Sequence, residues 1–289
     1  MTGGESGTYY ALGTLMAQHA SSNAGLNVTA VSSGGSKANV LELDDKTAQL
    51  AFCQSDVAAY AYEGSTFEDF EGMPITSFST VASLYEETVQ IVTCDPEIKS
   101  VEDLKGKNVS IGDSGSGVYF NALDVLDVYG LSVDDITPTY QSFQDSVDAI
   151  KDNKIAAGFI VAGAPTSAIT DLATTKEAFL VQIDEEHAKK LQEKSVFYNV
   201  TSIPAGTYPG IDEAVATVSV DSLILASNDV SEDDVYAFVA DIFDNLEELA
   251  GNHDKFKEFD IDKAVSYTVV PYHPGAVKYF GEKGKTVAS

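Results

Sequence analysis

Helical and strand patterns alternate along this chain, and that alternation restricts the fold more than any other feature of the sequence. Apolar residues recur at helical spacing in residues 12–19 and 235–249, whereas residues 155–161 form a short continuous apolar run. Such alternation is typical of α/β proteins in which most strands are parallel and helices cover the sheet. The sequence therefore predicts an α/β fold built from two α/β series, the second beginning near residue 100.

The expected elements are placed by their spacing and by the residues at their ends. Strands are expected at residues 27–31, 49–52, 78–84, 88–93, 108–111, 155–161 and 268–270. Helices are expected over 12–19, from 32–36 through Leu43, after Ser55 as N-cap, around 120–126, over 235–249 and from Pro274. Ser100 and Asp103 form a helix start that is similar to a capping box, with Asp in place of Glu.

The charge of the chain limits the kinds of partner that it can bind. Its 289 residues include 17 Lys or Arg and 45 Asp or Glu, a net charge of −28 at pH 7, and every one of the 17 is lysine. Such an acidic field repels nucleic acids and anionic membrane surfaces, so neither is an expected partner. The sequence also contains no apolar run of about eighteen residues, the length that would predict a transmembrane helix.

The number and spacing of the cysteines and histidines predict no metal site. Cys53 and Cys94 are the only cysteines, and a disulfide between them stays open at this point. None of the histidines lies at a metal-ligand spacing from another or from a cysteine, and no cofactor is expected. The histidines are His19, His187, His253 and His273.

Three loops rich in glycine and serine are candidate anion sites. They lie at residues 3–9, 32–36 and 113–117, each expected to follow a strand and to begin a helix. Helix N-termini leave backbone N–H groups free, and the helix dipole favours negative charge there. In a chain without arginine this is a natural way to hold a carboxylate. The alternative interpretation is that these are ordinary turns between strands and helices, which also need Gly and Ser.

Catalysis is not predicted. Residues 112–115 read Gly-Asp-Ser-Gly, as in serine proteases, but they are expected between a strand and a helix, and no histidine lies in a recognisable base motif. No P-loop lysine follows the glycine-rich loops, so nucleotide hydrolysis is not supported either. The pattern favours a protein that binds a ligand and is not an enzyme.

Several of these stretches together resemble the TAXI solute receptors, the binding component of TRAP-type (tripartite ATP-independent periplasmic) transporters. The resemblance runs from end to end of the chain, and its more specific stretches are IPAGTY at 203–208 and HPGA at 273–276. The segments that carry it are residues 3–10, 54–60, 83–86, 100–106 (SVEDLKG), 115–117, 161–166, 203–208 and 271–276.

The resemblance implies a type II periplasmic-binding-protein fold, with two α/β lobes joined by a two-strand hinge. Lobe one would hold residues 1–86 and 208–289, and lobe two residues 87–207. Receptors of this family close their lobes around a small carboxylate, here expected to be glutamate or glutamine, and deliver it to a membrane TRAP permease subunit. The expected location is extracytoplasmic, either periplasmic or anchored at the cell surface as a lipoprotein, with a signal peptide removed.

Ligand-binding residues follow from the resemblance and from the helix-terminus argument. Ser33, Gly34 and Ser114 come from the helix-terminus argument alone. Ala162, Ala164 and Val118 depart from residues common in the family, and they leave the ligand open. The positions that match the family are Gly4, Thr8, Tyr9, Gln54, Ser116, Gly117, Gly163, Ala164, Pro165 and Tyr208.

Two other function classes stay open from the sequence. Two-lobed α/β scaffolds also host biosynthetic enzymes and transferases, although this chain shows no nucleophile–base pair. A sensory ligand-binding module is the third class, and it would act through a signalling domain. A ligand-dependent gain in stability without product formation would favour binding over catalysis.

Overall fold

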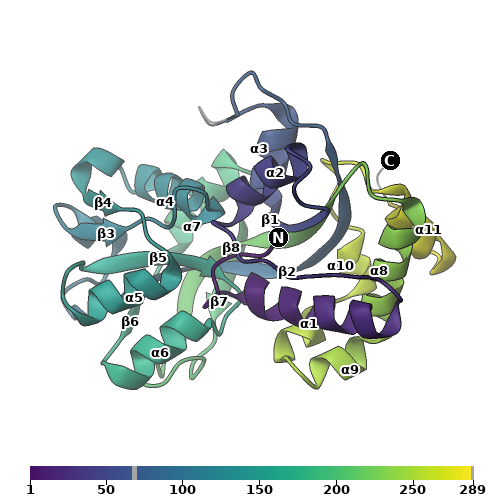
Figure 1. The fold of residues 1–289 in the computed structure, drawn as a ribbon. Helices are drawn as coiled ribbons and strands as arrows, with labels where there is room; N and C mark the ends of the chain where they lie inside the picture. The colour runs from purple at the N-terminus through teal and green to yellow at the C-terminus, as the bar shows by residue number, and fades with distance from the viewer. Residues whose placement is uncertain (67–69, 288–289) are drawn as a thin grey trace. The chain divides into compact units, whose positions relative to one another are not determined.

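The computed structural model describes residues 1–66 and 70–287, and the chain forms two compact α/β units (Figure 1). Unit 1 contains Met1–Glu5, Tyr9–Tyr85 and Asp221–Ser289, and unit 2 contains Ser6–Thr8 and Glu86–Val220. Two long strands, β2 (Phe78–Thr93) and β8 (Val215–Ser227), each contribute residues to both units. The α/β class predicted from the alternating patterns is therefore confirmed.

The sheet of unit 1 is short. Strand β1 (Leu50–Gln54) pairs antiparallel with the carboxyl half of β8, with Leu50 opposite Ala226, and β8 neighbours β2 in the strand order. The helices of this unit are α1 (Thr8–Asn23, whose first residue belongs to unit 2), α2 (Ser36–Asp44), α3 (Ser55–Glu63), α8 (Glu232–Asp244), α9 (Leu246–Ala250), α10 (Ile261–Ala264) and α11 (Pro274–Glu282). A 3₁₀ helix spans Asp254–Glu258.

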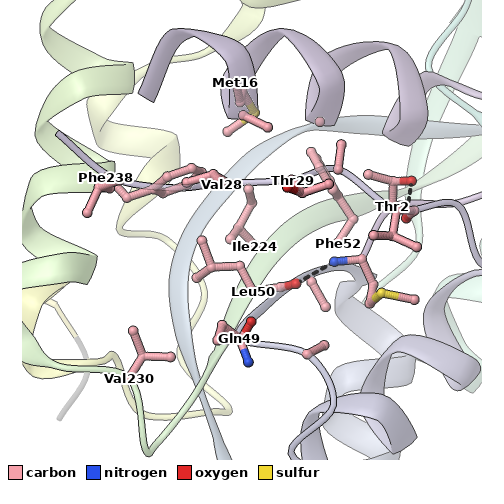
Figure 2. A pocket seen from close by; sticks show the side chains of 18 of the residues that line it. Thr2, Met16, Val28, Thr29, Gln49, Leu50, Phe52, Ile224, Val230 and Phe238 are labelled. Atoms are coloured by element: carbon pink, nitrogen blue, oxygen red, sulfur yellow. Dashed lines mark hydrogen bonds between the residues drawn. The ribbon is translucent and has the colours of Figure 1, made fainter. Parts of the chain in front are cut away.

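Residues 27–31, predicted as a strand, are extended but form no regular strand (Figure 2). Their neighbour is the amino-terminal segment, where the Thr2 N–H donates to the Val31 carbonyl at 2.9 Å and the Ser33 N–H donates to the Gly3 carbonyl at 3.3 Å. These contacts lie only at the carboxyl end of the segment, and that is too few for a ladder.

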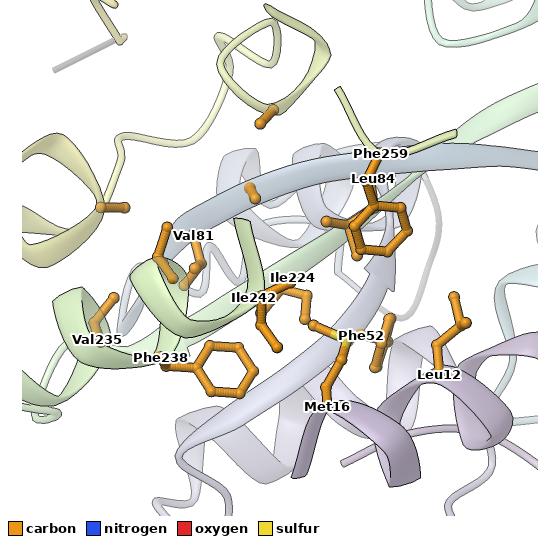
Figure 3. Close-up of a cluster of buried hydrophobic side chains, with 14 of the residues drawn as sticks. Leu12, Met16, Phe52, Val81, Leu84, Ile224, Val235, Phe238, Ile242 and Phe259 are labelled. Carbon is orange, nitrogen blue, oxygen red and sulfur yellow. The ribbon is translucent and has the colours of Figure 1, made fainter. Parts of the chain in front are cut away.

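The core of unit 1 joins its helices to its sheet (Figure 3). Leu12 and Met16 of α1 pack with Phe52 of β1 and with Phe238 and Ile242 of α8, all of them buried. Full burial of one such side chain stabilises a fold by about 1.5–3 kcal/mol. The helical spacing of these residues in the sequence therefore marks the faces that cover the sheet.

Unit 2 is built around β5 (Ala157–Ala162), which is buried along its whole length. Strand β5 pairs antiparallel with β2 and parallel with β3 (Asn108–Ser110), which in turn pairs parallel with β4 (Thr137–Thr139). Strand β6 (Phe179–Val181) pairs with β2, and β7 (Asn199–Ile203) pairs with β8. The helices are α4 (Gly117–Val128), α5 (Phe143–Lys151), α6 (Ser167–Thr175) and α7 (Glu185–Lys194), with 3₁₀ helices at Val101–Leu104 and Val133–Asp135.

Four further predictions of local structure are wrong. The runs at 78–84 and 88–93 form one strand, β2, and the helix predicted over 235–249 breaks at Asn245, whose φ is −123° and ψ 25°. Residues 268–270 form no strand, because only the neighbouring residue Tyr272 makes a bridge, to Thr80 of β2. Ser55 is the first residue of α3 and Gln54 is the N-cap, and the Ser55 Oγ instead accepts the Asp221 N–H at 3.2 Å.

Residues 208–220, placed in lobe one by the sequence prediction, lie in unit 2. The amino half of β8 pairs with β7, with Asn199 opposite Ser219, and Tyr208 packs in the same core cluster as Ile203 and Leu172. Strand pairing and core packing therefore hold this segment with unit 2, beyond the crossing point expected from the sequence.

Cys53 and Cys94 are both thiols, so the disulfide left open by the sequence is absent. Among residues 1–66 and 70–287, the structure contains no candidate membrane-spanning helix. The predicted capping box of Ser100 and Asp103 is confirmed at the start of the 3₁₀ helix Val101–Leu104.

Candidate functional site

The candidate site in unit 2 is the edge of the sheet at which β3 and β5 end. These two strands are parallel neighbours, so the loops that follow them, at 111–116 and 163–166, leave the same edge. Helix α4 begins directly after the first loop and α6 directly after the second. The free N–H groups of two helix N-termini are thus collected where ligands bind in α/β sheets, at the carboxyl ends of the strands.

The loop at 111–116 is shaped by its own residues. Gly112 has φ 82°, and a Cβ there would approach the Val118 Cβ to 2.6 Å, so only glycine fits. The Ser116 Oγ donates to the Asp113 carbonyl at 2.6 Å, and the Gly115 N–H donates to the Asp113 Oδ1 at 2.9 Å. The Ser116 hydroxyl, predicted to contact the ligand, is therefore engaged in forming the turn that starts α4.

The two other predicted residues of this loop differ in exposure. Ser114 is exposed at the tip, whereas Gly117 is buried as the first residue of α4. At a first helical position the backbone N–H has no acceptor within its own helix. Gly117 is thus placed to offer a backbone donor, and Ser114 to offer a hydroxyl.

The loop at 163–166 is held by a buried hydrogen-bond network that the sequence did not predict. The Thr166 N–H donates to the Tyr208 hydroxyl oxygen at 2.9 Å, and the Tyr208 hydroxyl donates to the Gln90 side-chain carbonyl. The Gln90 Nε2 donates to the Thr166 Oγ1 at 2.9 Å and to the Ala162 carbonyl at 3.3 Å. The network therefore holds Thr166, the residue before α6, through contacts with β2, with β5 and with the segment that contains Tyr208.

Burial raises the pKa of the Tyr208 hydroxyl above its usual value, so that hydroxyl stays a donor across the physiological range. Tyr208 is only 1% exposed, and its oxygen already has two partners, the Thr166 N–H and the Gln90 side chain. The structure therefore gives Tyr208 a role in positioning the loop. The direct ligand contact expected of it stays a prediction.

Thr8 reaches the same loop from the start of α1. Its Oγ1 donates to the Gly163 carbonyl at 3.2 Å, and the Thr166 Oγ1 donates to that carbonyl at 3.0 Å. Gly163 is buried, Ala164 is half-buried and Pro165 is exposed, and the Ala164–Pro165 peptide bond is cis. Of the residues predicted in this loop, Pro165 is the most accessible to a ligand.

Unit 1 has a comparable edge, where helices α1, α2 and α3 begin after neighbouring extended segments. The Asn39 Nδ2 donates to the Thr2 carbonyl at 2.6 Å and to the Phe52 carbonyl at 2.7 Å. The Ser33 Oγ also donates to the Thr2 carbonyl, at 3.1 Å, and the Gln54 N–H donates to the Ser36 Oγ at 3.0 Å. These bonds connect the three chain segments at this edge.

The predicted residues of unit 1 differ in accessibility. Gly4, Ser33 and Gly34 are half-buried, and a Cβ at Gly4 would meet nothing within 4 Å. Tyr9 is 7% exposed and stacks on Phe52 with ring centroids 4.8 Å apart, and Gln54 is 2% exposed. The ring of Tyr9 thus belongs to the core of the unit.

The structure distributes the predicted residues over two edges, one in each unit. Unit 1 holds Gly4, Tyr9, Ser33, Gly34 and Gln54, and unit 2 holds Thr8, Ser114, Ser116, Gly117, Gly163, Ala164, Pro165 and Tyr208. The sequence patterns do not identify Asn39, Gln90 and Thr166. A signal existed, since Gln90 interrupts the apolar run 89–92 and Asn39 lies beside the apolar Val40, and a buried amide needs hydrogen-bond partners.

Within residues 1–66 and 70–287, no group of three or more His, Cys, Asp or Glu residues is placed to hold a metal ion. The donors collected at the two edges are backbone N–H groups and hydroxyls, which bind anions and polar groups. The arrangement can therefore hold a small anion by hydrogen bonds, without arginine forks.

Residues 1–284 match the model of a family described as the NMT1-like family. Among solved structures, the periplasmic aliphatic sulphonate binding protein SsuA from Escherichia coli is similar with a TM-score of 0.52 at 14% identity, covering 94% of this chain and 87% of that chain. PhnD1 from Prochlorococcus marinus (MIT 9301), in complex with methylphosphonate, is similar with a TM-score of 0.55 at 11% identity, covering 93% of this chain and 90% of that chain.

A third similar structure is a binding protein component of an ABC phosphonate transporter from Pseudomonas aeruginosa, with a TM-score of 0.52 at 11% identity, covering 86% of this chain and 74% of that chain. At these identities the likeness concerns the fold alone. It confirms the two-lobed α/β fold of periplasmic binding proteins that the sequence predicts.

Proposed function

This chain belongs to the NMT1-like family, and from that membership we propose that it is a solute-binding receptor that captures a small anion for a membrane transporter. The observation that carries the proposal is the pair of helix N-termini, of α4 and α6, at one edge of the unit-2 sheet. Such an edge binds an anion through fixed backbone donors, and it needs no lysine or arginine side chain. The receptor has no turnover of its own.

The ligand that we favour is a small carboxylate such as glutamate or glutamine. The resemblance to TAXI receptors supports this class, and fixed N–H groups and hydroxyls suit a planar carboxylate. A phosphonate or sulphonate is the alternative, because two of the similar structures are named for binding these anions. Both classes share a negatively charged group of oxygens on a small organic body.

The proposed response to the ligand is hinge closure about the two connecting strands, β2 and β8. The liganded form is then recognised by a membrane partner outside the cytoplasm. The TAXI resemblance supports a TRAP permease subunit as that partner. An ABC transporter is the alternative, supported by the similar phosphonate-binding component from Pseudomonas aeruginosa.

A thermal-shift panel tests the proposal. The purified chain is unfolded and refolded to remove bound ligand, and then heated with glutamate, glutamine, methylphosphonate, an alkanesulphonate and a neutral sugar. A ligand at a thousandfold excess over its Kd adds about 4 kcal/mol to the free energy of unfolding. We expect one anion class to raise Tm, with the ligand recovered unchanged by mass spectrometry.

Two outcomes would contradict the proposal. A shift with the neutral sugar alone would show that the donors do not select a negative charge. Conversion of the ligand into product during incubation would favour an enzyme on the same two-lobed fold. A shift with phosphonate and none with glutamate would keep the receptor and replace the carboxylate.

A further inference from the structure

Strand β7 lies at an edge of the unit-2 sheet. Among residues 1–66 and 70–287 it pairs with β8 and with no other strand. Ser202 lies opposite Ala216, whose carbonyl accepts the Ile183 N–H at 2.9 Å and therefore points away from β7. Bonded and non-bonded pairs alternate along an antiparallel ladder. Ser202 and Val200 thus belong to the non-bonded pairs, and their backbone N–H and C=O groups point outward, away from β8.

This outer side of β7 is open. Val200 is 51% exposed, Ser202 is exposed, and Val196, just before the strand, is 86% exposed. In the part of the chain that the structure describes, the outward backbone groups of Val200 and Ser202 have no protein partner. An edge strand of this kind is a template for pairing with another strand.

The opposite edge of the same sheet, β4, is protected against such pairing. The Thr137 N–H donates to the Lys107 carbonyl at 2.8 Å, and the Thr139 carbonyl accepts the Ile111 N–H at 3.0 Å, so both threonines face β3. Pro138, between them, faces outward and has no N–H to offer. Proteins commonly block free edges with proline or charge, and β7 has neither, since residues 195–203 contain no proline and no charged residue.

The charge around β7 favours a second copy of this chain as its partner. Two chains of net charge −28 repel each other, so they can meet only where the local field is small. The uncharged segment continues from β7 through residue 211. Helix α7, which packs against β7, carries three Glu and three Lys, with ion pairs of 2.7 Å from Lys189 to Glu185 and from Lys190 to Glu186. This part of an acidic chain is therefore locally neutral.

We propose that β7 pairs antiparallel with β7 of a second copy about a twofold axis, so that the unit-2 sheets of two chains become continuous. Thr201 lies opposite Thr201 of the second copy, and Val200 lies opposite its Ser202. In this register the outward N–H and C=O groups of Val200 and Ser202 form four hydrogen bonds between the chains. Paired threonines are also favourable across neighbouring strands. The contact is self-complementary, as a twofold interface requires.

Other registers fit less well. Pairing centred on Val200 would place Ser202 opposite Tyr198 of the second copy. The Tyr198 N–H already donates to the Ser195 carbonyl at 3.3 Å, and the Tyr198 carbonyl accepts the Gln192 Nε2 at 3.3 Å. The register centred on Thr201 leaves those bonds in place. The inference is independent of the ligand and of the transporter.

Sedimentation from about 1 µM to about 1 mM protein tests the proposal, at low salt and in 1 M NaCl. The mass should rise from 30.7 kDa toward twice that value, and more readily in high salt, which screens the repulsion of the acidic chains. Hydrogen exchange is measured at both ends of this range. The Val200 and Ser202 amides should exchange more slowly at the higher concentration, because only the pair of chains gives them acceptors.

Ser202→Pro and Ser202→Ala are the matched variants. The proline removes one outward N–H in each chain and with it two of the four bonds, so the Kd of the pair should rise about tenfold or more. Ser202→Ala keeps the N–H and should leave Kd within about twofold of wild type. Circular dichroism verifies that both variants fold. A wild-type chain that stays at 30.7 kDa at about 1 mM in both salt conditions would overturn the proposal. Equal Kd values for the two variants would also overturn it.

A second pair of variants tests the edge without proline. Val200→Lys places a charge on the free edge and should weaken association about fivefold or more. Leu41→Lys adds the same charge at a 42% exposed position of α2, in unit 1, and should not weaken it. Association that Leu41→Lys weakens and Val200→Lys does not would place the interface elsewhere and contradict pairing through β7.

Discussion

In each unit a buried side-chain amide holds the chain segments at the candidate edge, but the two amides bond to different kinds of partner. In unit 1, Asn39 is 0% exposed and donates only to backbone carbonyls, those of Thr2 and Phe52. In unit 2, Gln90 is 1% exposed and its amide bonds to side chains at both ends, those of Thr166 and Tyr208. Asn39 therefore joins segments of unit 1 through backbone carbonyls, with Ser33 and Ser36 making further bonds there, whereas the side chains of three residues bond to one another in unit 2.

The difference predicts where each edge is sensitive. The side-chain carbonyl of Asn39 has no hydrogen-bond partner among residues 1–66 and 70–287, so its function rests on the two bonds of its Nδ2. The unit-2 network distributes the same task over several bonds, and loss of one leaves others in place.

Replacing Asn39 by leucine should cost about 3 kcal/mol of unfolding free energy, because two buried carbonyls lose a donor at once. Urea unfolding followed by circular dichroism measures the loss. Asn252→Leu is the matched control, since the Asn252 amide makes its bond to the Glu248 carbonyl at the surface. Equal stability of the two variants would contradict a special role of Asn39.

The stability of unit 1 should also change with pH between 6 and 8, whereas that of the unit-2 network should not. The α-amino group of Met1 has a pKa of 8.0 in the unfolded chain and about 6 in the folded one, where burial disfavours its protonated form, so the unfolded state binds more protons in this window. Stability should therefore rise by about 2 kcal/mol from pH 6 to pH 8.

Acetylation of Met1 is the control for this pH dependence. Acetylation removes the charge of the α-amino group and should flatten the rise of stability with pH. Burial lowers the pKa values of His253 and His273 from 6.5, and these histidines titrate alike in the acetylated and the unmodified chain. Denaturant midpoints at several pH values give the comparison. An unchanged slope after acetylation would assign the effect to another group.

Replacing Tyr208 by phenylalanine should cost about 1.5 kcal/mol, because the Thr166 N–H loses its acceptor inside the protein. Ligand affinity should fall as well, since the loop before α6 is then less fixed. Tyr236→Phe is the matched control, because the Tyr236 hydroxyl donates to Glu282 at the surface. Retention of wild-type stability and affinity in Tyr208→Phe would show that the network does not position the loop.

Replacing Thr8 by valine should cost about 1 kcal/mol, since its bond to the Gly163 carbonyl is lost. Thr14 lies on the same helix, and its buried hydroxyl makes no hydrogen bond in the described part of the chain. Thr14→Val should therefore be neutral or stabilising. The pair is compared by chemical denaturation, and a larger loss at Thr14 than at Thr8 would reverse the interpretation.

Local patterns predicted much of this architecture. The apolar spacing around Leu12 and Phe238 identified two helices correctly, and the glycine-rich loop before α4 lies at a helix start as expected. The composition of residues 27–31 predicts a strand, but a ladder also needs a partner along its length. Composition alone does not supply that information.

The buried amides were missed for a similar reason. Asn39 and Gln90 are polar residues among apolar ones, and the sequence does not say which distant carbonyl or hydroxyl each one meets. Gln90 and Tyr208 are 118 residues apart, and only the folded chain brings them together. The sequence therefore favours Tyr208 as a ligand contact, and only the folded chain shows that its hydroxyl holds the 163–166 loop.

Binding of the anion by backbone N–H groups of a helix N-terminus can be tested at Ser167. This exposed residue is the first of α6, and Thr166 before it has φ −100° and ψ 135°, values compatible with a following proline. Ser167→Pro removes one N–H and adds no charge, whereas Ser167→Ala keeps the N–H and removes only the hydroxyl. Both variants are titrated calorimetrically with glutamate and with methylphosphonate.

We predict that whichever anion binds the wild-type chain binds Ser167→Pro about tenfold more weakly, a loss of about 1.4 kcal/mol, and binds Ser167→Ala with unchanged affinity. Wild-type affinity in Ser167→Pro, with both variants folded, would contradict the claim.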